Sequence, residues 1–207
     1  MLVEIWSDVV CPWCYIGKRR FERALASFDG EVEVVWRSFQ LDPTYPKGAR
    51  KPLVEHLAAK YRSTPEQARA MNERVTTLAA AEGLSYDLGS YTVVNTFDAH
   101  RLTHLARAHG LGGEMHERLL RAQLVEGQVL DDADTLTRLA AEVGLSEDDA
   151  RAVIAGDDYG SGVTDDILEA RALGISGVPF FAFDRRYGVS GAQTADVFVQ
   201  ALQTAAA

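Results

Sequence analysis

The sequence predicts a mixed α/β fold, in which a β-α-β unit and a later α-β-β-α unit build one sheet around a large all-helical insertion. Two observations predict this. Strand patterns occur only near the two ends of the chain, and the long stretch between them shows helical patterns alone. Neither end has enough strands for a stable sheet of its own. We therefore expect an α/β domain from residues 1–45 plus 160–207, and a helical insertion domain over residues 46–159.

The first forty residues predict the β-α-β unit. Residues 2–6 and 32–39 are rich in Val, Ile and Trp, which favour strands. Between them, apolar residues from Ile16 to Phe28 recur at near-helical spacing, and we expect a helix from about residue 11 to residue 28. The pair of cysteines in Cys11-Pro12-Trp13-Cys14 thus lies at the first strand-to-helix turn.

Capping residues divide the insertion into helices after an irregular linker marked by Pro43, Pro46 and Pro52. Thr64-Pro65-Glu66-Gln67 is typical of a helix start, and glycines follow most of the expected helices. The chain then closes with two strands and a helix. The expected helices of the insertion and of the closing unit cover residues 64–83, 95–109, 113–126, 132–143, 146–156, 161–173 and 194–204, and the closing strands cover residues 178–183 and 187–190.

Composition and charge exclude several classes of function. The chain has 47% hydrophobic and 25% charged residues, as a globular protein does, and its net charge is −9 at pH 7. An acidic chain without a Lys/Arg cluster is a poor binder of nucleic acid. No apolar run has the ~20 residues that a membrane span needs, and the N-terminus lacks the basic region of a secretory signal. We expect a cytoplasmic protein that binds neither nucleic acid nor a membrane.

The two cysteines predict redox chemistry, because they are the only ones and lie three residues apart. That spacing in a first helical turn places the two Cα atoms about 5–6 Å apart, which suits a disulfide. Cys11 would lie at the helix N-terminus, where free N–H groups and the helix dipole favour a thiolate, and Pro12 suits the first helical position. We expect Cys11 to be the exposed nucleophile and the more buried Cys14 to resolve the mixed disulfide. Trp13 adds no charge, which predicts a weaker oxidant than a motif with His at that position.

Two neighbouring features have alternative interpretations. A CxxC pair can be half of a zinc site, but zinc needs further ligands and none is near in the sequence; His100 and His104 have metal spacing without acidic or Cys partners. We expect no metal. Asp8, three residues before Cys11, could accept the proton of Cys14 during resolution, or it could simply be a turn or capping residue.

The chain resembles the DsbA-like branch of the thioredoxin superfamily, and within it the FrnE-like group of cytoplasmic dithiol oxidoreductases. This group neighbours the 2-hydroxychromene-2-carboxylate isomerases and the kappa-class glutathione transferases. The residues that carry the resemblance keep their order along nearly the whole chain: Ser7–Gly17 (SDVVCPWCYIG), Val94–Leu102 (VNTFDAHRL), Gly174–Phe181 (GISGVPFF) and Ser190–Gln193 (SGAQ).

The resemblance implies a thioredoxin-like fold with a helical insertion. It also implies a cis Val178–Pro179 bond facing the two cysteines, with the Val178 backbone turned outward to pair with an extended substrate. By the same resemblance Asn95, Thr96 and His100 line the cleft, although a capped helix with a packed His explains them equally well. The isomerase and transferase relatives have Ser in place of the first Cys, whereas this chain has both cysteines.

Three functions follow, in order of preference. The first is a dithiol–disulfide oxidoreductase or isomerase that acts on protein or low-molecular-weight thiols. It needs no cofactor beyond its own Cys11–Cys14 disulfide, with glutathione or another small thiol as a potential co-substrate. The second is a glutathione-dependent isomerase or transferase for a small aromatic compound. The third is a binding module that has kept the fold without catalysis.

Overall fold

One four-stranded sheet joins the two ends of the chain in the structure, a computed structural model that describes residues 1–207. Its strands are β1 (Leu2–Ser7), β2 (Glu33–Ser38), β5 (Phe180–Phe183) and β6 (Tyr187–Ser190). Their order in the sheet is β2-β1-β5-β6. β1 pairs parallel with β2 and antiparallel with β5, and β6 pairs antiparallel with β5. The predicted fold class, with one sheet built from both ends, is confirmed.

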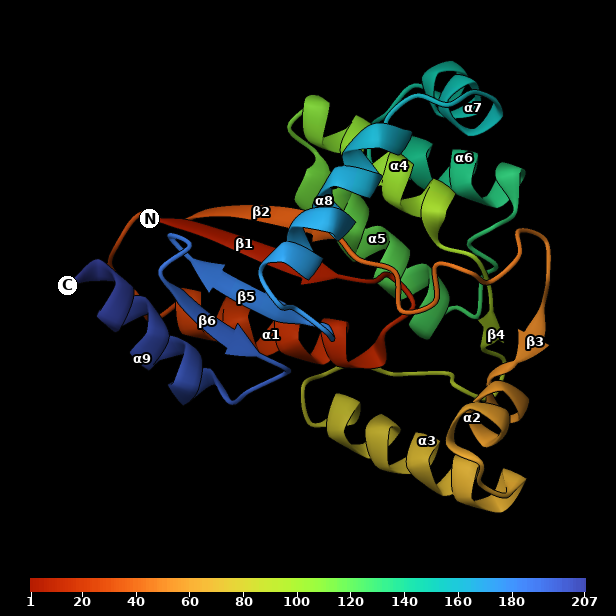
Figure 1. Ribbon diagram of the computed structural model, residues 1–207, viewed down its shortest axis with the longest axis horizontal. Coiled ribbons are helices and arrows are strands. Elements are labelled where there is room, and N and C mark those ends of the chain that lie inside the picture. Colours follow the sequence, from red (N-terminus) through yellow and green to blue (C-terminus); the bar gives the residue numbers. More distant parts are fainter.

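Nine helices surround this sheet and extend beyond it (Figure 1). α1 and α9 cover one face of the sheet, and α8 crosses the other face (Figure 1). The helices are α1 (Pro12–Leu25), α2 (Leu53–Tyr61), α3 (Pro65–Ala80), α4 (Phe97–Ala108), α5 (Gly112–Leu124), α6 (Ala133–Glu142), α7 (Glu147–Ala155), α8 (Gly160–Ala172) and α9 (Ala195–Ala206).

The insertion differs from the sequence prediction in two details. α2 was not predicted, because it follows Pro52 without a side-chain cap and none of its residues is fully buried, so its apolar pattern is weak. A two-stranded pair, β3 (Lys51–Pro52) with β4 (Thr92–Val93), also lies in the predicted all-helical segment. Strands of two residues are too short to produce an alternating pattern. The division into residues 1–45 plus 160–207 and an inserted 46–159 stays a prediction.

A buried apolar cluster joins the N-terminal and C-terminal parts of the chain. On one face of β1, Val3 and Ile5 pack with Phe21 of α1 and Phe198 of α9. Full burial of each such side chain contributes about 1.5–3 kcal/mol. A second cluster fills the space between α4, α5, α6 and α7, and a third surrounds the two cysteines.

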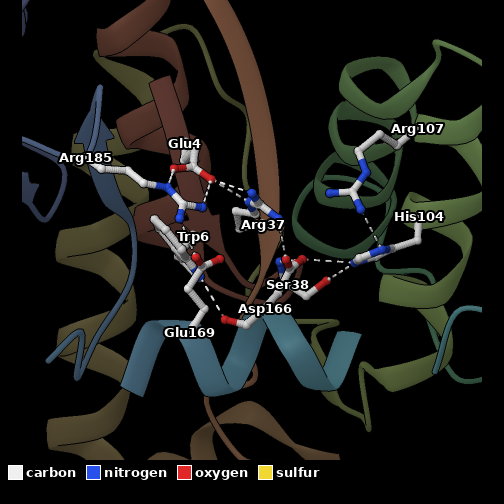
Figure 2. A network of polar contacts seen from close by, with 9 residues as sticks. All are labelled: Glu4, Trp6, Arg37, Ser38, His104, Arg107, Asp166, Glu169 and Arg185. Carbon is white, nitrogen blue, oxygen red and sulfur yellow. Dashed lines mark hydrogen bonds and ion pairs between the residues drawn. The ribbon is translucent and has the colours of Figure 1, made fainter. Parts of the chain in front are cut away.

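A buried polar network fastens α8 to the opposite face of the sheet (Figure 2). Asp166 of α8 accepts hydrogen bonds from Arg37 Nη1 and the Ser38 backbone N–H, both at 2.9 Å, and lies 3.0 Å from His104 Nε2. Arg37 in turn pairs with Glu4 of β1. The network therefore ties together β1, β2, α4 and α8.

None of the helices combines the length and apolar character that crossing a bilayer demands.

Candidate active site

The two cysteines occupy the first turn of α1, as the sequence predicts. Cys11 is the N-cap residue with extended backbone angles (φ −88°, ψ 113°), and Pro12 is the first helical residue. The Cys11 N–H donates to the Asp8 carbonyl and the Cys14 N–H donates to the Cys11 carbonyl, both at 3.0 Å. Both thiols are free in this structure. The short turn after β1 therefore sets both cysteines at the helix N-terminus.

The exposure of Cys11 differs from the sequence expectation. Cys11 is only 4% exposed and Cys14 only 1% exposed, so the predicted exposed nucleophile is largely covered by its neighbours. The distinction between the two cysteines survives in another form: Cys11 lines a cavity and Cys14 does not. Burial raises the pKa of Cys14 well above its ordinary value, and Cys11 raises it further, while the Ser7 hydroxyl and the Asp8 backbone N–H oppose this rise.

The loop before β5 faces the cysteines across the cavity. The Val178–Pro179 bond is cis, which confirms what the family resemblance implies. The Cys11 thiol lies 3.7 Å from the Val178 carbonyl oxygen, and Pro179 is buried. The Val178 N–H has no acceptor within the protein. This N–H is thus available to a bound molecule beside Cys11.

Two tyrosines of the insertion hold the backbone around Cys11, and sequence reasoning missed both. The Tyr86 hydroxyl donates to the Pro12 carbonyl at 2.6 Å, and the Tyr91 hydroxyl donates to the Val10 carbonyl at 2.7 Å. Burial raises the pKa of both phenols, so they remain donors at neutral pH. Both lie in an irregular segment between α3 and α4, where no periodic pattern marks them as buried.

Asp8 is buried, and its carboxylate bonds to groups other than the thiols. Oδ2 accepts the Leu41 N–H at 2.8 Å, and Oδ1 lies 3.3 Å from His100 Nε2. It is the backbone N–H of Asp8 that contacts Cys14. These bonds favour a structural use of the carboxylate, although it also lines the cavity.

The three residues predicted to line the cleft separate into two layers. Thr96 lines the cavity and accepts a hydrogen bond from Gln40 at 3.3 Å. Asn95 bonds instead to the Phe97 N–H and the Tyr45 carbonyl, at the start of α4. His100 lies behind Asp8 and does not line the cavity.

The cavity has a volume of about 560 Å³ and opens between the first turn of α1, the cis-proline loop and the helices α2 and α3. Most of its lining is apolar, and four apolar side chains at its wall are exposed: Trp13, Leu41, Tyr61 and Met71. Lys60, Arg74 and His56 supply its basic groups. The carboxylates of Asp8 and Asp42 also line the cavity, so its polar groups carry both signs of charge.

Metal-ligating side chains do not gather anywhere in groups of three or more. The predicted alternative site has other partners: His100 pairs with Asp8, and His104 bonds to Ser38 and Arg107 and pairs with Asp166. Nε2 of His100 and both ring nitrogens of His104 thus have partners within the protein.

Comparison with families and curated proteins gives two matches. A family model described as the DSBA-like thioredoxin domain matches residues 2–203. The uncharacterized protein YwbO of Bacillus subtilis (strain 168) is 31% identical over 144 residues. That match covers 69% of this chain and 66% of YwbO, just under two thirds of its length.

Solved structures match over nearly the whole chain. The probable DsbA oxidoreductase SCO1869 from Streptomyces coelicolor is 46% identical with a TM-score of 0.96, covering 99% of this chain and 89% of that chain. The cytosolic disulfide reductase DsbM from Pseudomonas aeruginosa, solved with GSH, is 23% identical with a TM-score of 0.66, covering 99% and 98%. A 2-hydroxychromene-2-carboxylate isomerase is 10% identical with a TM-score of 0.74, covering 99% and 95%. At these identities the last two show a shared fold alone.

Proposed function

The chain belongs to the DsbA-like thioredoxin family, and we propose that it is a thiol–disulfide oxidoreductase in which Cys11 and Cys14 alternate between a dithiol and a disulfide. One observation carries the proposal. Cys11 lies at the N-terminus of α1, lines the cavity and faces the Val178 backbone, while Cys14 is enclosed behind it. A nucleophile at a binding cleft with a second thiol behind it is the arrangement that two-step exchange requires.

The exchange balances in two steps. The Cys11 thiolate attacks one sulfur of a substrate disulfide, so that a Cys11–substrate bond forms and the substrate S–S bond breaks, releasing one thiolate that takes up a proton. Cys14 then attacks Cys11 Sγ, which forms the Cys11–Cys14 disulfide and releases the second substrate thiol. Two electrons pass to the substrate, and the two protons of the dithiol end on the two product thiols. The reverse sequence oxidises a substrate dithiol.

The surroundings of Cys11 support a protein or low-molecular-weight thiol as substrate. An extended segment could accept the Val178 N–H as one hydrogen bond, while Pro12 and Trp13 border the sulfur and Thr96 provides a polar group in the same cavity. Glutathione or another small acidic thiol suits the basic groups Lys60 and Arg74, and the DsbM structure contains GSH. Pro179 would act only by holding Val178 opposite Cys11.

The test is insulin reduction with wild type, Cys11→Ser and Cys14→Ser. We expect Cys11→Ser to lose the activity entirely. Cys14→Ser should instead accumulate a mixed disulfide, visible as a mass increase equal to the bound thiol. Wild type should lose two hydrogens on oxidation, which serves as the internal control. Equal insulin reduction by wild type and Cys11→Ser would contradict the proposal.

The largely apolar lining of the cavity favours one second candidate, a glutathione-dependent isomerase or transferase for a small aromatic compound. Such an enzyme would activate glutathione without changing its own oxidation state. Glutathione-dependent turnover of an aromatic compound by Cys11→Ser, with tight glutathione binding, would support this candidate over the first. Loss of both in Cys11→Ser would exclude it.

A further inference from the structure

Two tyrosine hydroxyls hold the peptide groups on either side of Cys11. The segment that carries both tyrosines connects α3 with β4 and runs beside the first turn of α1 (Figure 1). Tyr91 donates to the Val10 carbonyl at 2.7 Å, and Tyr86 donates to the Pro12 carbonyl at 2.6 Å. Both tyrosines are buried, with exposed fractions of 4% and 8%. The exchange described above uses neither hydroxyl, although both bond to the backbone next to the nucleophile.

The two hydrogen bonds fix different peptide groups. A trans peptide group is planar, so its C=O and its N–H point in opposite directions. The N–H opposite the Val10 carbonyl belongs to Cys11 and is already bonded within the turn after β1. The N–H opposite the Pro12 carbonyl belongs to Trp13 and has no acceptor within the protein. Tyr86 therefore holds a peptide group whose N–H is still available.

The Trp13 N–H lies where a helix offers a donor to its N-cap side chain. Cys11 is the N-cap of α1 and Trp13 is the second helical residue, whose N–H is one of the two that such a side chain can accept. Pro12 has no N–H, and the Cys14 N–H donates to the Cys11 carbonyl. No N–H or O–H donates to the Cys11 sulfur, because the thiol itself donates to the Val178 carbonyl at 3.7 Å. A thiolate has no hydrogen to donate there, and the Trp13 N–H is the nearest unused donor of the helix start.

Tyr86 is held in place and keeps its hydrogen. Its ring stacks on Tyr15, with the centroids 6.2 Å apart and the planes 22° from parallel, and the Tyr15 hydroxyl donates to Glu117. Both rings belong to the apolar cluster around the two cysteines. Burial, followed by the charges of the two thiols, raises the pKa of Tyr86, so the phenol stays a donor while the thiols ionise. A donor on the carbonyl of a peptide group also polarises that group and strengthens its N–H as a donor.

Other titratable groups surround Cys11 from each neighbouring element. Cys14 lies behind it on α1, and Tyr91 lies on the segment after α3. The remaining groups line the cavity with Cys11 and are Asp8, Asp42, His56, Lys60 and Arg74. None of these side chains donates a hydrogen bond from nitrogen or oxygen to the Cys11 sulfur. The backbone of the helix start is therefore the source of donors closest to this thiol.

We propose that Tyr86 is a positioning residue for the nucleophile: its hydroxyl fixes and polarises the Pro12–Trp13 peptide group, so that the Trp13 N–H stabilises the Cys11 thiolate. This inference rests on the proposed function. It adds no reactant to the exchange, since Trp13 keeps its hydrogen and the Cys11 proton leaves as before. What Tyr86 changes is the fraction of Cys11 that is thiolate. A single side chain of the insertion thus sets the reactivity of a cysteine on α1.

The test is the pH profile of Cys11 alkylation by iodoacetamide in the reduced protein. The thiolate is the form that reacts, and tandem mass spectrometry distinguishes label on Cys11 from label on Cys14. The variant is Tyr86→Phe, which removes the hydroxyl and keeps the ring. Tyr15→Phe is the matched control, because it removes a neighbouring hydroxyl that bonds to the Glu117 side chain and not to the backbone of the cysteine turn.

In Tyr86→Phe we expect alkylation to be about fivefold slower than in wild type on the rising limb of the profile, as the loss of one hydrogen bond predicts. The two profiles should join at high pH, where both proteins carry a full thiolate. Tyr15→Phe should follow wild type within about twofold at every pH, because its hydroxyl does not contact the peptide groups around Cys11.

Three results would overturn the inference: an unchanged profile in folded Tyr86→Phe, an equal slowing in Tyr15→Phe, or a Tyr86→Phe rate reduced by the same factor at every pH, which would indicate altered access to Cys11. If Tyr86→Phe does not fold, the Trp13 amide proton of wild type decides instead. Its resonance should move downfield as Cys11 ionises, and a resonance that does not move contradicts the donor role. Alkylation needs no disulfide substrate, so a wild type without insulin reduction refutes the proposed function separately.

Discussion

Gly17 sets how closely the cysteine-bearing helix approaches the cis-proline loop. A Cβ atom at this position would lie 2.9 Å from Pro179 Cγ and 3.4 Å from the Phe181 ring. Contacts below 3.0 Å force neighbouring atoms to move. The missing side chain therefore allows α1 to pack directly on the loop that presents Val178 to Cys11.

Replacing Gly17 with alanine should weaken both the packing and the exchange reaction. Helix propensity favours Ala by about 1 kcal/mol, but overpacking costs about 1–3 kcal/mol, so we expect a net loss of stability. Urea unfolding measures this loss, and insulin reduction measures the accompanying slower exchange. Gly177→Ala is the control for the stability measurement, because a Cβ there meets no atom within 4 Å. A Gly17→Ala protein with unchanged stability and activity would contradict this interpretation.

At the scale of elements, α3 forms one wall of the cavity through Met71, Val75 and Leu78. Its first turn has a complete capping box. The Gln67 N–H donates to the Thr64 hydroxyl, and the Gln67 side chain accepts the Thr64 N–H. This box satisfies two of the backbone N–H groups that a helix start leaves free. The wall of the cavity is thus stabilised at a point distant from the cysteines.

Thr64→Ala should cost about 1 kcal/mol and should loosen α3 before the rest of the molecule. Hydrogen exchange of the α3 amides measures the local effect, and urea unfolding measures the global one. Ser63→Ala is the control at the adjacent position, because the buried Ser63 hydroxyl has no hydrogen-bond partner. Faster exchange in Ser63→Ala than in Thr64→Ala would be evidence against the cap.

At the scale of the whole molecule, Asp166 connects the last helix before the cis-proline loop to both parallel strands and to α4 (Figure 2). Burial alone would raise the pKa of this carboxyl, but hydrogen bonds from His104 and the Ser38 N–H, together with the charge of Arg37, hold it below its ordinary value of 3.8. The carboxylate therefore stabilises the folded state fully above that value, and this contribution is lost as the pH falls through the folded pKa.

Asp166→Asn should lower the free energy of unfolding by about 3 kcal/mol at pH 7, because it leaves Arg37 without one of its buried partners. The difference from wild type should shrink as the pH falls below 3.8 toward the lowered pKa of the folded carboxyl, where the wild-type carboxylate is protonated. Urea unfolding at a series of pH values measures both effects. Asp165→Asn, at the exposed neighbouring position, should match wild type. A difference that stays constant with pH would show that the charge of Asp166 is not the cause.

The sequence alone predicted the order of the elements apart from α2, β3 and β4, the closure of one sheet from both chain ends, and the location of the cysteine motif at a strand-to-helix turn. These features depend on local signals: apolar periodicity, caps such as Thr64, and glycines after helices act over a few residues. The cis Val178–Pro179 bond came from the family resemblance, because an X-Pro pair by itself allows both isomers.

The tertiary structure alone decided what surrounds the cysteines. Residues far apart in the chain cover Cys11. The hydrogen bonds of Tyr86 and Tyr91, and the pair formed by Ser7 and His116, also connect distant segments. Tyr86 and Pro12 are separated by 74 positions, and Ser7 and His116 by 109. Such contacts produce no periodic pattern in either segment, because the local sequence around one residue does not depend on which distant residue it contacts. The motif was therefore readable from the sequence, whereas its environment follows only from how the insertion packs against α1.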